Sequence, residues 1–374
     1  MPEERILARA KVERIGEKEK GIYTFSSEVT AKNIKINAAD IPDYRSGIEM
    51  FLKDVIGAEK VIPSLETIDA VGFKTVLAFG FTGVHELTDE VMRELRARLD
   101  IAPLHNKAYY DVITTFQSLC PNARLIGAFE TAFHTERPLY AKIYGIPYSW
   151  YEKDRIYRYG MHGASHGYIA DRVREIAGEN KRIINCHLGG SSSVCAIRDG
   201  KSIDISSGFS PQTGLPHANR TGDLDIYALV YKLKHGEELN SVLTELTTNG
   251  GLLGMSGVSK DMRDIELAAS QGNERAQMTI DMLSYQIAKF IGSYYVALEG
   301  LDYLVFTGGI GENSAVIREN VCKRLECLGI HMDAQKNLAG PAERCISSVS
   351  AGPQVWIIPT DEEVRVARQI MTVC

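Results

Sequence analysis

The alternation of hydrophobic and polar residues predicts secondary structure from the first residues onward. Residues 6–12 alternate between apolar and polar side chains, and Ile34 and Ile36 repeat the pattern further on. This period of two is typical of half-buried strands and favours a meander at a sheet edge. Because Ile15 falls out of phase, the first strand is expected to end or bulge near Val12.

Longer apolar stripes separate these strands from the next ones. Ile48, Phe51 and Leu52 recur at helical spacing, and Thr88 followed by two acidic residues is typical of a helix start. The predicted elements are a helix over 45–56, a strand over 68–79, helices over 88–99 and 103–119, and a strand over 124–129 that ends at Glu130.

The second half repeats this order more strongly. Three strands are expected over 182–188, 193–198 and 202–206, and Asp199-Gly200 indicates a type I′ hairpin turn. Helices follow, and a strand over 303–306 leads into a glycine turn. The remaining predicted elements are helices over 223–235, 239–246, 259–271, 274–299 and 315–328, strands over 330–332 and 355–359, and a last helix that begins near residue 360 and ends near 371. Strands and helices in this order predict mixed sheets covered by helices.

Composition narrows the possible functions. The 374 residues carry a net charge of −6, which gives no electrostatic case for nucleic acid or an anionic membrane surface. No apolar run reaches the ~20 residues of a membrane span. The seven cysteines include no CxxC pair, so neither a disulfide framework nor a zinc site is indicated, and free thiols in the cytoplasm are expected.

Two glycine-rich stretches are candidates for holding phosphate. The stretch Gly308-Gly309-Ile310-Gly311 follows a buried strand and precedes Glu312 and Asn313. Gly309 and Gly311 permit positive φ and carry no Cβ atom that would block a close ligand. The stretch His187-Leu188-Gly189-Gly190-Ser191 lies between two apolar strands and offers backbone N–H groups and hydroxyls. Each pattern also fits an ordinary tight turn.

Several charged or basic side chains are candidates for chemistry. His162 and His166 are four residues apart, and either a histidine that donates to a charged oxygen, a structural histidine or a zinc pair fits that spacing. Arg220 precedes a helix and is suited to stabilising a phosphoryl group, although a surface ion pair is the alternative. Glu130 ends a buried strand, where α/β sites usually lie, although an ordinary turn carboxylate fits too.

Acidic residues stand at two further helix starts. Asp261-Met262-Arg263 and Asp361-Glu362-Glu363 could hold Mg²⁺ through water or simply favour the helix dipole. For Asp361 and Glu363 the helix-start interpretation is preferred.

Six motifs in series then point to one family. HGASH, CHLGGSSS, NRTGDLD, GVSKDMRD, FTGGIGEN and PTDEE together resemble the acetate/propionate kinases of the actin-like ATPase and sugar kinase superfamily. The resemblance extends from about Glu3 to the end of the chain. It implies an α/β fold of two ribonuclease H-like domains with mixed sheets covered by helices. The expected domains are residues 1–132 with 362–374, and residues 133–361, with the active site in the cleft between them.

The resemblance also implies an activity and a set of site residues. Such enzymes transfer the γ-phosphoryl of ATP reversibly to a short carboxylate, with Mg²⁺, and act as cytoplasmic homodimers. His162, Arg220 and Glu130 match the catalytic positions, and Glu362 matches the metal ligand. The positions that match the acyl pocket and the nucleotide site are Val76, Leu104, Met161 and Pro211, and His187, Leu188, Gly189, Gly190, Ser191, Asp261, Met262, Arg263, Gly309, Ile310, Gly311, Glu312 and Asn313.

The chain departs from the family pattern at three site positions and at its beginning. Lys74 stands where the family has a substrate-binding arginine, Leu77 replaces a histidine, and Glu130 replaces the catalytic aspartate. The family also opens with a strand and an N-x-G-S-S-S-x-K loop, whereas Glu3 aligns about twenty residues into that pattern. Either a late start codon or a true loss explains this offset.

These departures leave two functional hypotheses. The first is a kinase that phosphorylates acetate or propionate. The second is a weakened or inactive relative that binds nucleotide in a sensing or scaffold role.

Overall fold

The computed structural model describes residues 4–57, 59–98 and 103–373, without the side chains of residues 103–106. The chain divides into two compact units, one formed by Met1–Ala128 with Gln369–Cys374 and the other by Phe129–Arg368. The second junction lies inside the last helix, α15 (Glu362–Ile370). The domain limits inferred from the sequence stay a prediction, because compactness alone does not define an independently folding domain.

The first unit begins with the predicted antiparallel meander. Strands β1 (Arg9–Glu13), β2 (Gly21–Ser27) and β3 (Lys32–Ala39) pair in that order. Tyr23 and Phe25 on β2 are buried and pack against Val55 of helix α1 (Tyr44–Val55). The Tyr23 hydroxyl donates to Asp54 over 2.9 Å and so ties the meander to the helix.

A second three-stranded sheet completes the first unit. It has the order β4-β6-β5, formed by Ala70–Thr75, Arg124–Phe129 and Val84–Glu86, with Phe129 counted in the second unit. A short 3₁₀ turn, η1 (Leu65–Thr67), precedes it. Helices α2 (Asp89–Ala97) and α3 (Pro103–Leu119) confirm the sequence prediction, whereas β4 is shorter than predicted and β5 was missed because three residues show too little alternation.

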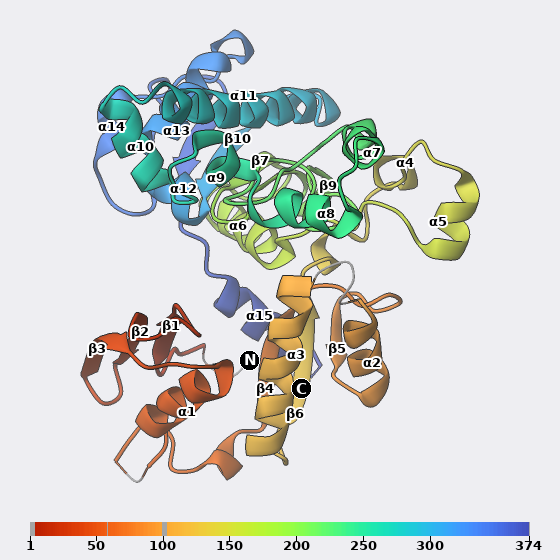
Figure 1. Ribbon diagram of the computed structural model, residues 1–374. Helices are drawn as coiled ribbons and strands as arrows, with labels where there is room; N and C mark the ends of the chain where they lie inside the picture. The colour runs from red at the N-terminus through yellow and green to blue at the C-terminus, as the bar shows by residue number, and fades with distance from the viewer. Residues whose placement is uncertain (1–3, 58, 99–102, 374) are drawn as a thin grey trace. The chain divides into compact units, whose positions relative to one another are not determined.

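The second unit is built on a six-stranded mixed sheet with helices on both faces (Figure 1). The strand order is β11-β12-β10-β7-β8-β9, formed by Arg344–Cys345, Gln354–Ile357, Tyr303–Thr307, Arg182–His187, Ser193–Arg198 and Lys201–Ile205. Strand β10 runs parallel to β7 and β12, whereas β7, β8 and β9 form an antiparallel meander.

The period of two along β7 explains how the sheet acquires two apolar faces. Ile184 and Cys186 join the core under the long helix α11 (Glu274–Ala297) and helix α13 (Ala315–Arg324). Ile183 joins the opposite core, under α6 (Gly163–Ala177). A strand buried on both faces reads as a continuous apolar run, as β7 does.

Most predicted elements of the second unit are confirmed, with shifted ends. The Asp199-Gly200 turn has φ of 52° and 75°, as a type I′ turn requires. The strand predicted over 330–332 is wrong, because only Met332 bridges Ser347 there. The remaining helices are η2 (Ala132–His134), α4 (Leu139–Lys142), α5 (Tyr148–Asp154), α7 (Ile226–Lys234), α8 (Leu239–Thr248), α9 (Gly251–Ser256), α10 (Met262–Ser270), η3 (Glu326–Leu328) and α14 (Ala334–Leu338).

The glycine stretch after β10 differs from the prediction. It forms a short helix, α12 (Gly308–Asn313), instead of an irregular turn. Gly308 has a positive φ of 78°, whereas Gly309 and Gly311 do not use the positive φ that glycine permits. The chain therefore turns at the first glycine, and the later ones lie in a helical backbone.

Candidate active site

The glycine–serine loop, residues 188–192 between β7 and β8, hydrogen-bonds both helix α12 and the segment that precedes Arg220. The Leu188 carbonyl accepts hydrogen bonds from the backbone N–H groups of Ile310 (2.8 Å) and Gly311 (3.2 Å). The Leu188 N–H donates to the carbonyl of Thr307 over 2.8 Å. Helix α12 is therefore held directly against the glycine–serine loop, and two stretches about 120 residues apart form one surface.

Gly308 and Glu312 fix this contact. A Cβ atom on Gly308 would lie 2.7 Å from the Leu188 carbonyl oxygen, closer than real contacts allow. The Glu312 carboxylate accepts from the Gly308 N–H over 2.8 Å and from the Thr360 N–H over 3.4 Å. It thereby ties the start of α12 to the residues just before α15.

The same loop holds the segment that carries Arg220. Ala218 N–H donates to the Gly190 carbonyl and Ser192 N–H donates to Nδ1 of His217, both over 3.0 Å. Arg220 is buried, and its Nη1 donates to the Pro211 carbonyl over 2.7 Å. Burial lowers the pKa of Arg220 to about 10, so the guanidinium keeps its charge at neutral pH. A desolvated cation of this kind interacts strongly with an anion brought beside it.

His162 contacts the two residues that flank the loop, His187 and Ser193. It caps helix α6, with a left-handed φ of 58° that is uncommon outside glycine. Its Nδ1 lies 2.8 Å from the hydroxyl of Ser193, and its ring stacks on that of His187 at a centroid distance of 4.3 Å. The imidazole is half-buried and close to the glycine–serine loop. A non-glycine residue held in this conformation is often part of a functional site.

Glu130 is held next to His162 through the backbone. The N–H of Gly163 donates to the Glu130 carbonyl over 3.0 Å, and the Glu130 side chain is buried. A Cβ atom on Gly163 would lie only 2.1 Å from that carbonyl oxygen. Only glycine at this position therefore lets the end of β6 approach the start of α6.

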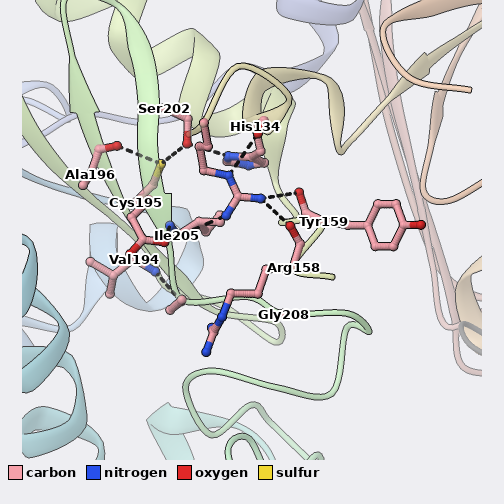
Figure 2. A network of polar contacts seen from close by, with 12 residues as sticks. His134, Arg158, Tyr159, Val194, Cys195, Ala196, Ser202, Ile205 and Gly208 are labelled. Carbon is pink, nitrogen blue, oxygen red and sulfur yellow. Dashed lines mark hydrogen bonds and ion pairs between the residues drawn. The ribbon is translucent and has the colours of Figure 1, made fainter. Parts of the chain in front are cut away.

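A buried polar network supports the segment before His162 (Figure 2). In this network, Nδ1 of His134 lies 2.8 Å from the Ser202 hydroxyl, and Nε2 of the same ring lies 3.0 Å from the Met161 carbonyl. The guanidinium of Arg137 donates to the carbonyls of Arg158 (2.6 Å) and Tyr159 (2.9 Å). Sequence reasoning missed both supports, although charged and polar residues just after a buried strand are a usable signal.

His134 should make the stability of the second unit sensitive to acid. Burial, aided by the charge of Arg137, lowers its pKa to about 3. Because the unfolded histidine binds a proton near pH 6.5 and the folded one does not, stability is present above that pH and is lost as pH falls. Between pH 7.5 and 5.5, His134 should lower the free energy of unfolding by about 1.4 kcal/mol.

This prediction can be measured by urea unfolding followed through tryptophan fluorescence. The chain's two tryptophans, Trp150 and Trp356, both lie in the second unit. His134→Gln should reduce the loss of stability between the two pH values, and the exposed His235→Gln serves as the control. An identical pH dependence in H134Q and the wild type would contradict the prediction.

The Asp261–Arg263 motif lies at the start of α10 and is joined to α13. Asp261 caps the helix by accepting from the Arg263 N–H over 2.9 Å, and it forms an ion pair with the Arg263 guanidinium at 2.6 Å. Met262 is buried in the core. Glu266, one turn further along, hydrogen-bonds the Ser314 hydroxyl, which caps α13 directly after α12. The two predicted nucleotide-binding motifs are therefore linked through a side chain that sequence reasoning missed.

Asp361 and Glu362 lie at the start of α15 and have different surroundings. Asp361 accepts from the Val364 N–H over 3.0 Å, which confirms its helix-start role. Glu362 lies half-buried in the first turn. Among the described residues no three His, Cys, Asp or Glu side chains come together as a metal cluster. A single carboxylate still fits Mg²⁺, which is usually held by one or two carboxylates together with substrate phosphates and water.

Three predicted substrate positions belong to the first unit. Lys74 lies half-buried in β4, and Val76 is buried directly after it. The third, Leu104, lies in α3 with its side chain outside the described residues. Met161 and Pro211 are buried in the second unit. Met161 directly precedes His162, and the Pro211 carbonyl accepts a hydrogen bond from Arg220. In the described part of the chain, no helix is long and apolar enough to cross a bilayer.

Known proteins resemble the chain over almost its whole length. The Acetokinase family profile matches residues 1–368. An acetate kinase of Shouchella clausii is 41% identical over 373 residues, covering 98% of this chain and 93% of that protein. The crystal structure of Porphyromonas gingivalis acetate kinase has a TM-score of 0.84 at 36% identity and covers 100% of this chain and 94% of that one. A propionate kinase from Francisella tularensis has a TM-score of 0.86 at 32% identity, covering 97% and 92%.

Fold and similarity together define the class of protein. The mixed sheets covered by helices form the two-domain fold of the actin-like ATPase and sugar kinase superfamily, as the sequence predicted. Within that class, the chain belongs to the acetokinase family. The family assignment made from the six motifs is confirmed.

Proposed function

We propose that the chain transfers the γ-phosphoryl group of ATP to acetate or propionate and forms an acyl phosphate and ADP. The observation that carries the proposal is the convergence of helix α12, the Arg220 segment and His162 on the glycine–serine loop and on Ser193, the first residue of β8. Backbone N–H groups, a buried guanidinium and an imidazole are the groups that phosphoryl transfer needs, because its catalysis is mainly positioning and charge stabilisation.

The proposed reaction makes little use of acid–base catalysis. A carboxylate oxygen of the acid attacks the γ-phosphorus, the new oxygen–phosphorus bond forms, and the bond to the oxygen bridging the β- and γ-phosphates breaks. The nucleophile carries no proton, so no general base is required. Arg220 and His162 would stabilise the charge on the equatorial oxygens. Glu130 would orient neighbouring groups at the phosphoryl site.

The nucleotide and metal would be held by groups already described. We propose that residues 187–191, 261–263 and 309–313 contact ATP or ADP. Leu188 joins the first segment to α12, and Glu266 joins α10 to Ser314, which directly follows α12. Glu362 would hold Mg²⁺ with the nucleotide phosphates. When bound, Mg²⁺ neutralises negative charge on the phosphates.

A direct assay tests this function. The purified chain is incubated with ATP, Mg²⁺ and acids of two to four carbons, and acyl phosphate is trapped with hydroxylamine as the coloured hydroxamate. We expect hydroxamate with acetate or propionate and less with butyrate, because the resemblance to the acetate/propionate kinases implies a small acyl pocket. Absence of hydroxamate with every acid, together with ATP binding by calorimetry, would favour a non-catalytic nucleotide-binding protein.

Lys74 gives a test of how the carboxylate is bound. Lysine carries the charge but lacks the planar fork with which arginine holds a carboxylate through two hydrogen bonds. Lys74→Arg is therefore expected to lower the KM for acetate by about three- to tenfold with little change in the KM for ATP. The exposed Lys35→Arg in the same unit is the matched control. An unchanged or higher KM for acetate in K74R would show that Lys74 does not contact the acid.

We also propose a cytoplasmic homodimer that binds neither nucleic acid nor membrane as part of its function. The net charge of −6 supports the last two points. Size-exclusion chromatography with light scattering should give about twice the monomer mass of 41.4 kDa. A single species at the monomer mass would contradict the dimer.

A further inference from the structure

A chain of three buried side chains leads from the centre of the sheet to His162. The amide nitrogen of Asn185, on β7, lies 2.8 Å from Nδ1 of His166 on α6. Nε2 of His166 lies 2.8 Å from the hydroxyl of Ser193 on β8, and the same hydroxyl lies 2.8 Å from Nδ1 of His162. Asn185, His166 and Ser193 are each 0% exposed, so water does not compete for these contacts.

The direction of each hydrogen bond follows from the amide. An amide nitrogen only donates, so Nδ1 of His166 must accept and is unprotonated. A neutral imidazole then carries its proton on Nε2, which donates to the Ser193 oxygen. The Ser193 hydroxyl accepts from His166. Among the described residues, Nδ1 of His162 is the one acceptor that this buried hydroxyl reaches, so the hydroxyl donates its proton there. That nitrogen is therefore an acceptor, and the proton of a neutral His162 lies on Nε2.

We infer that Asn185, His166 and Ser193 are positioning residues that fix His162 as the tautomer with its proton on Nε2. His162 then presents a hydrogen-bond donor from a neutral ring, without having to acquire a proton before it meets an anionic oxygen. The catalytic role of this tautomer rests on the proposed function. The tautomer itself is a property of the free protein and is measured without turnover.

The surroundings of this relay, the hydrogen-bonded chain of Asn185, His166 and Ser193, keep His166 neutral. His166 is completely buried, and burial together with His134 and His187 lowers its pKa well below the usual value. The titratable groups that face the relay are His134, 5.8 Å from His166 between ring centroids, and His187, which stacks on His162. Glu130 lies beside the start of α6 through its carbonyl contact with Gly163. A protonated His166 would break the first link of the chain, because Nδ1–H would face the amide nitrogen of Asn185 as a second donor, while Nε2–H would still donate to Ser193.

Ser193→Ala removes the link while keeping a small buried side chain. The tautomer is measured by two-dimensional ¹H–¹⁵N NMR of protein labelled in histidine, with the His162 signals assigned by loss in His162→Asn. In the wild type we expect Nδ1 of His162 to have the shift of an unprotonated nitrogen. In S193A its shift should move toward an average of the two tautomers. The kcat for acyl phosphate formation should fall by about 10- to 100-fold, with a smaller change in the KM for ATP.

Two further variants separate this role from a structural one. Ser284→Ala removes another completely buried hydroxyl of the same unit and should leave the His162 spectrum and kcat unchanged. Asn185→Asp replaces the donor with an acceptor and should reverse the chain, so that Nδ1 of His162 becomes the protonated nitrogen. The kcat of N185D should then fall as pH rises, since His162 must gain a second proton to donate through Nε2.

The outcomes are decisive in either direction. A wild-type spectrum with the proton on Nδ1 of His162 would overturn the inference, as would an S193A protein whose spectrum and kcat match those of S284A. If the wild type forms no acyl phosphate, the proposed function fails, and the NMR result still supports or refutes the tautomer by itself.

Discussion

Arg220→Ala is expected to lower kcat for acyl phosphate formation by about 10³-fold, with a much smaller change in the KM for ATP. An arginine that stabilises a transferring phosphoryl group contributes about 10³–10⁵-fold in kcat in other phosphotransferases. Loss in kcat without a matching rise in KM is typical of an interaction made mainly in the transition state. The measurement is steady-state kinetics of hydroxamate formation on R220A.

The structure explains why Arg220 cannot be replaced by another cation. The guanidinium is buried and held by the Pro211 carbonyl, which leaves its remaining donors in a fixed plane. Arg220→Lys should therefore recover little of the activity. The exposed Arg275→Lys, whose guanidinium also donates to carbonyls in the same unit, is the matched control and should keep kcat within about twofold. A loss in R220K no greater than in R275K would contradict the assigned role.

Gly163→Ala is expected to lower both stability and activity. The new methyl group would meet the Glu130 carbonyl oxygen at 2.1 Å, so the end of β6 and the start of α6 must move apart. Overpacking of this kind costs about 1–3 kcal/mol. A displacement of about 1 Å at His162 or Glu130 should lower kcat by about 10²-fold. Thermal unfolding and hydroxamate kinetics on G163A measure the two effects.

Gly292→Ala provides the control for the same substitution elsewhere. Gly292 lies within α11, and a Cβ atom there would have no heavy atom within 4 Å. Alanine should therefore stabilise the protein by about 0.5–1 kcal/mol through helix propensity and leave kcat unchanged. If G163A behaved like G292A, the close approach between Gly163 and Glu130 would not be needed.

The elements of this protein were predictable wherever local patterns determine them. Helix α3 has the predicted ends, and the Asp199-Gly200 turn has the predicted geometry, because capping, periodicity and turn chemistry act within a few residues. The error at Met332 arose because a short apolar run does not distinguish a strand from an extended connection. Helix α12 was missed because glycine-rich sequence disfavours a helix, whereas its contacts with Leu188 and Arg318 stabilise it here.

The candidate site was likewise predictable only where its residues are close together in the sequence. Its motifs, the glycine–serine loop among them, were visible in the sequence. The contacts that join them were not, since Ala218 meets Gly190, and Ile310 meets Leu188, only in the folded chain. The relay to His162 was also invisible. Ser193 and His166 belong to recognised motifs, but Asn185 appeared only as a polar residue in an apolar strand. A buried amide in such a strand is a signal that sequence reasoning can use, because a buried polar group requires a partner.

The central claim is that the γ-phosphoryl of ATP reaches a carboxylate oxygen, and ³¹P NMR of one reaction mixture tests it most directly. With ATP, Mg²⁺ and acetate, the γ-phosphate signal should decrease while acetyl phosphate and ADP signals grow in equal amounts, and the reaction should reverse when acetyl phosphate and ADP are supplied instead. Unchanged ATP, or conversion of its γ-phosphate only to inorganic phosphate, would contradict the account.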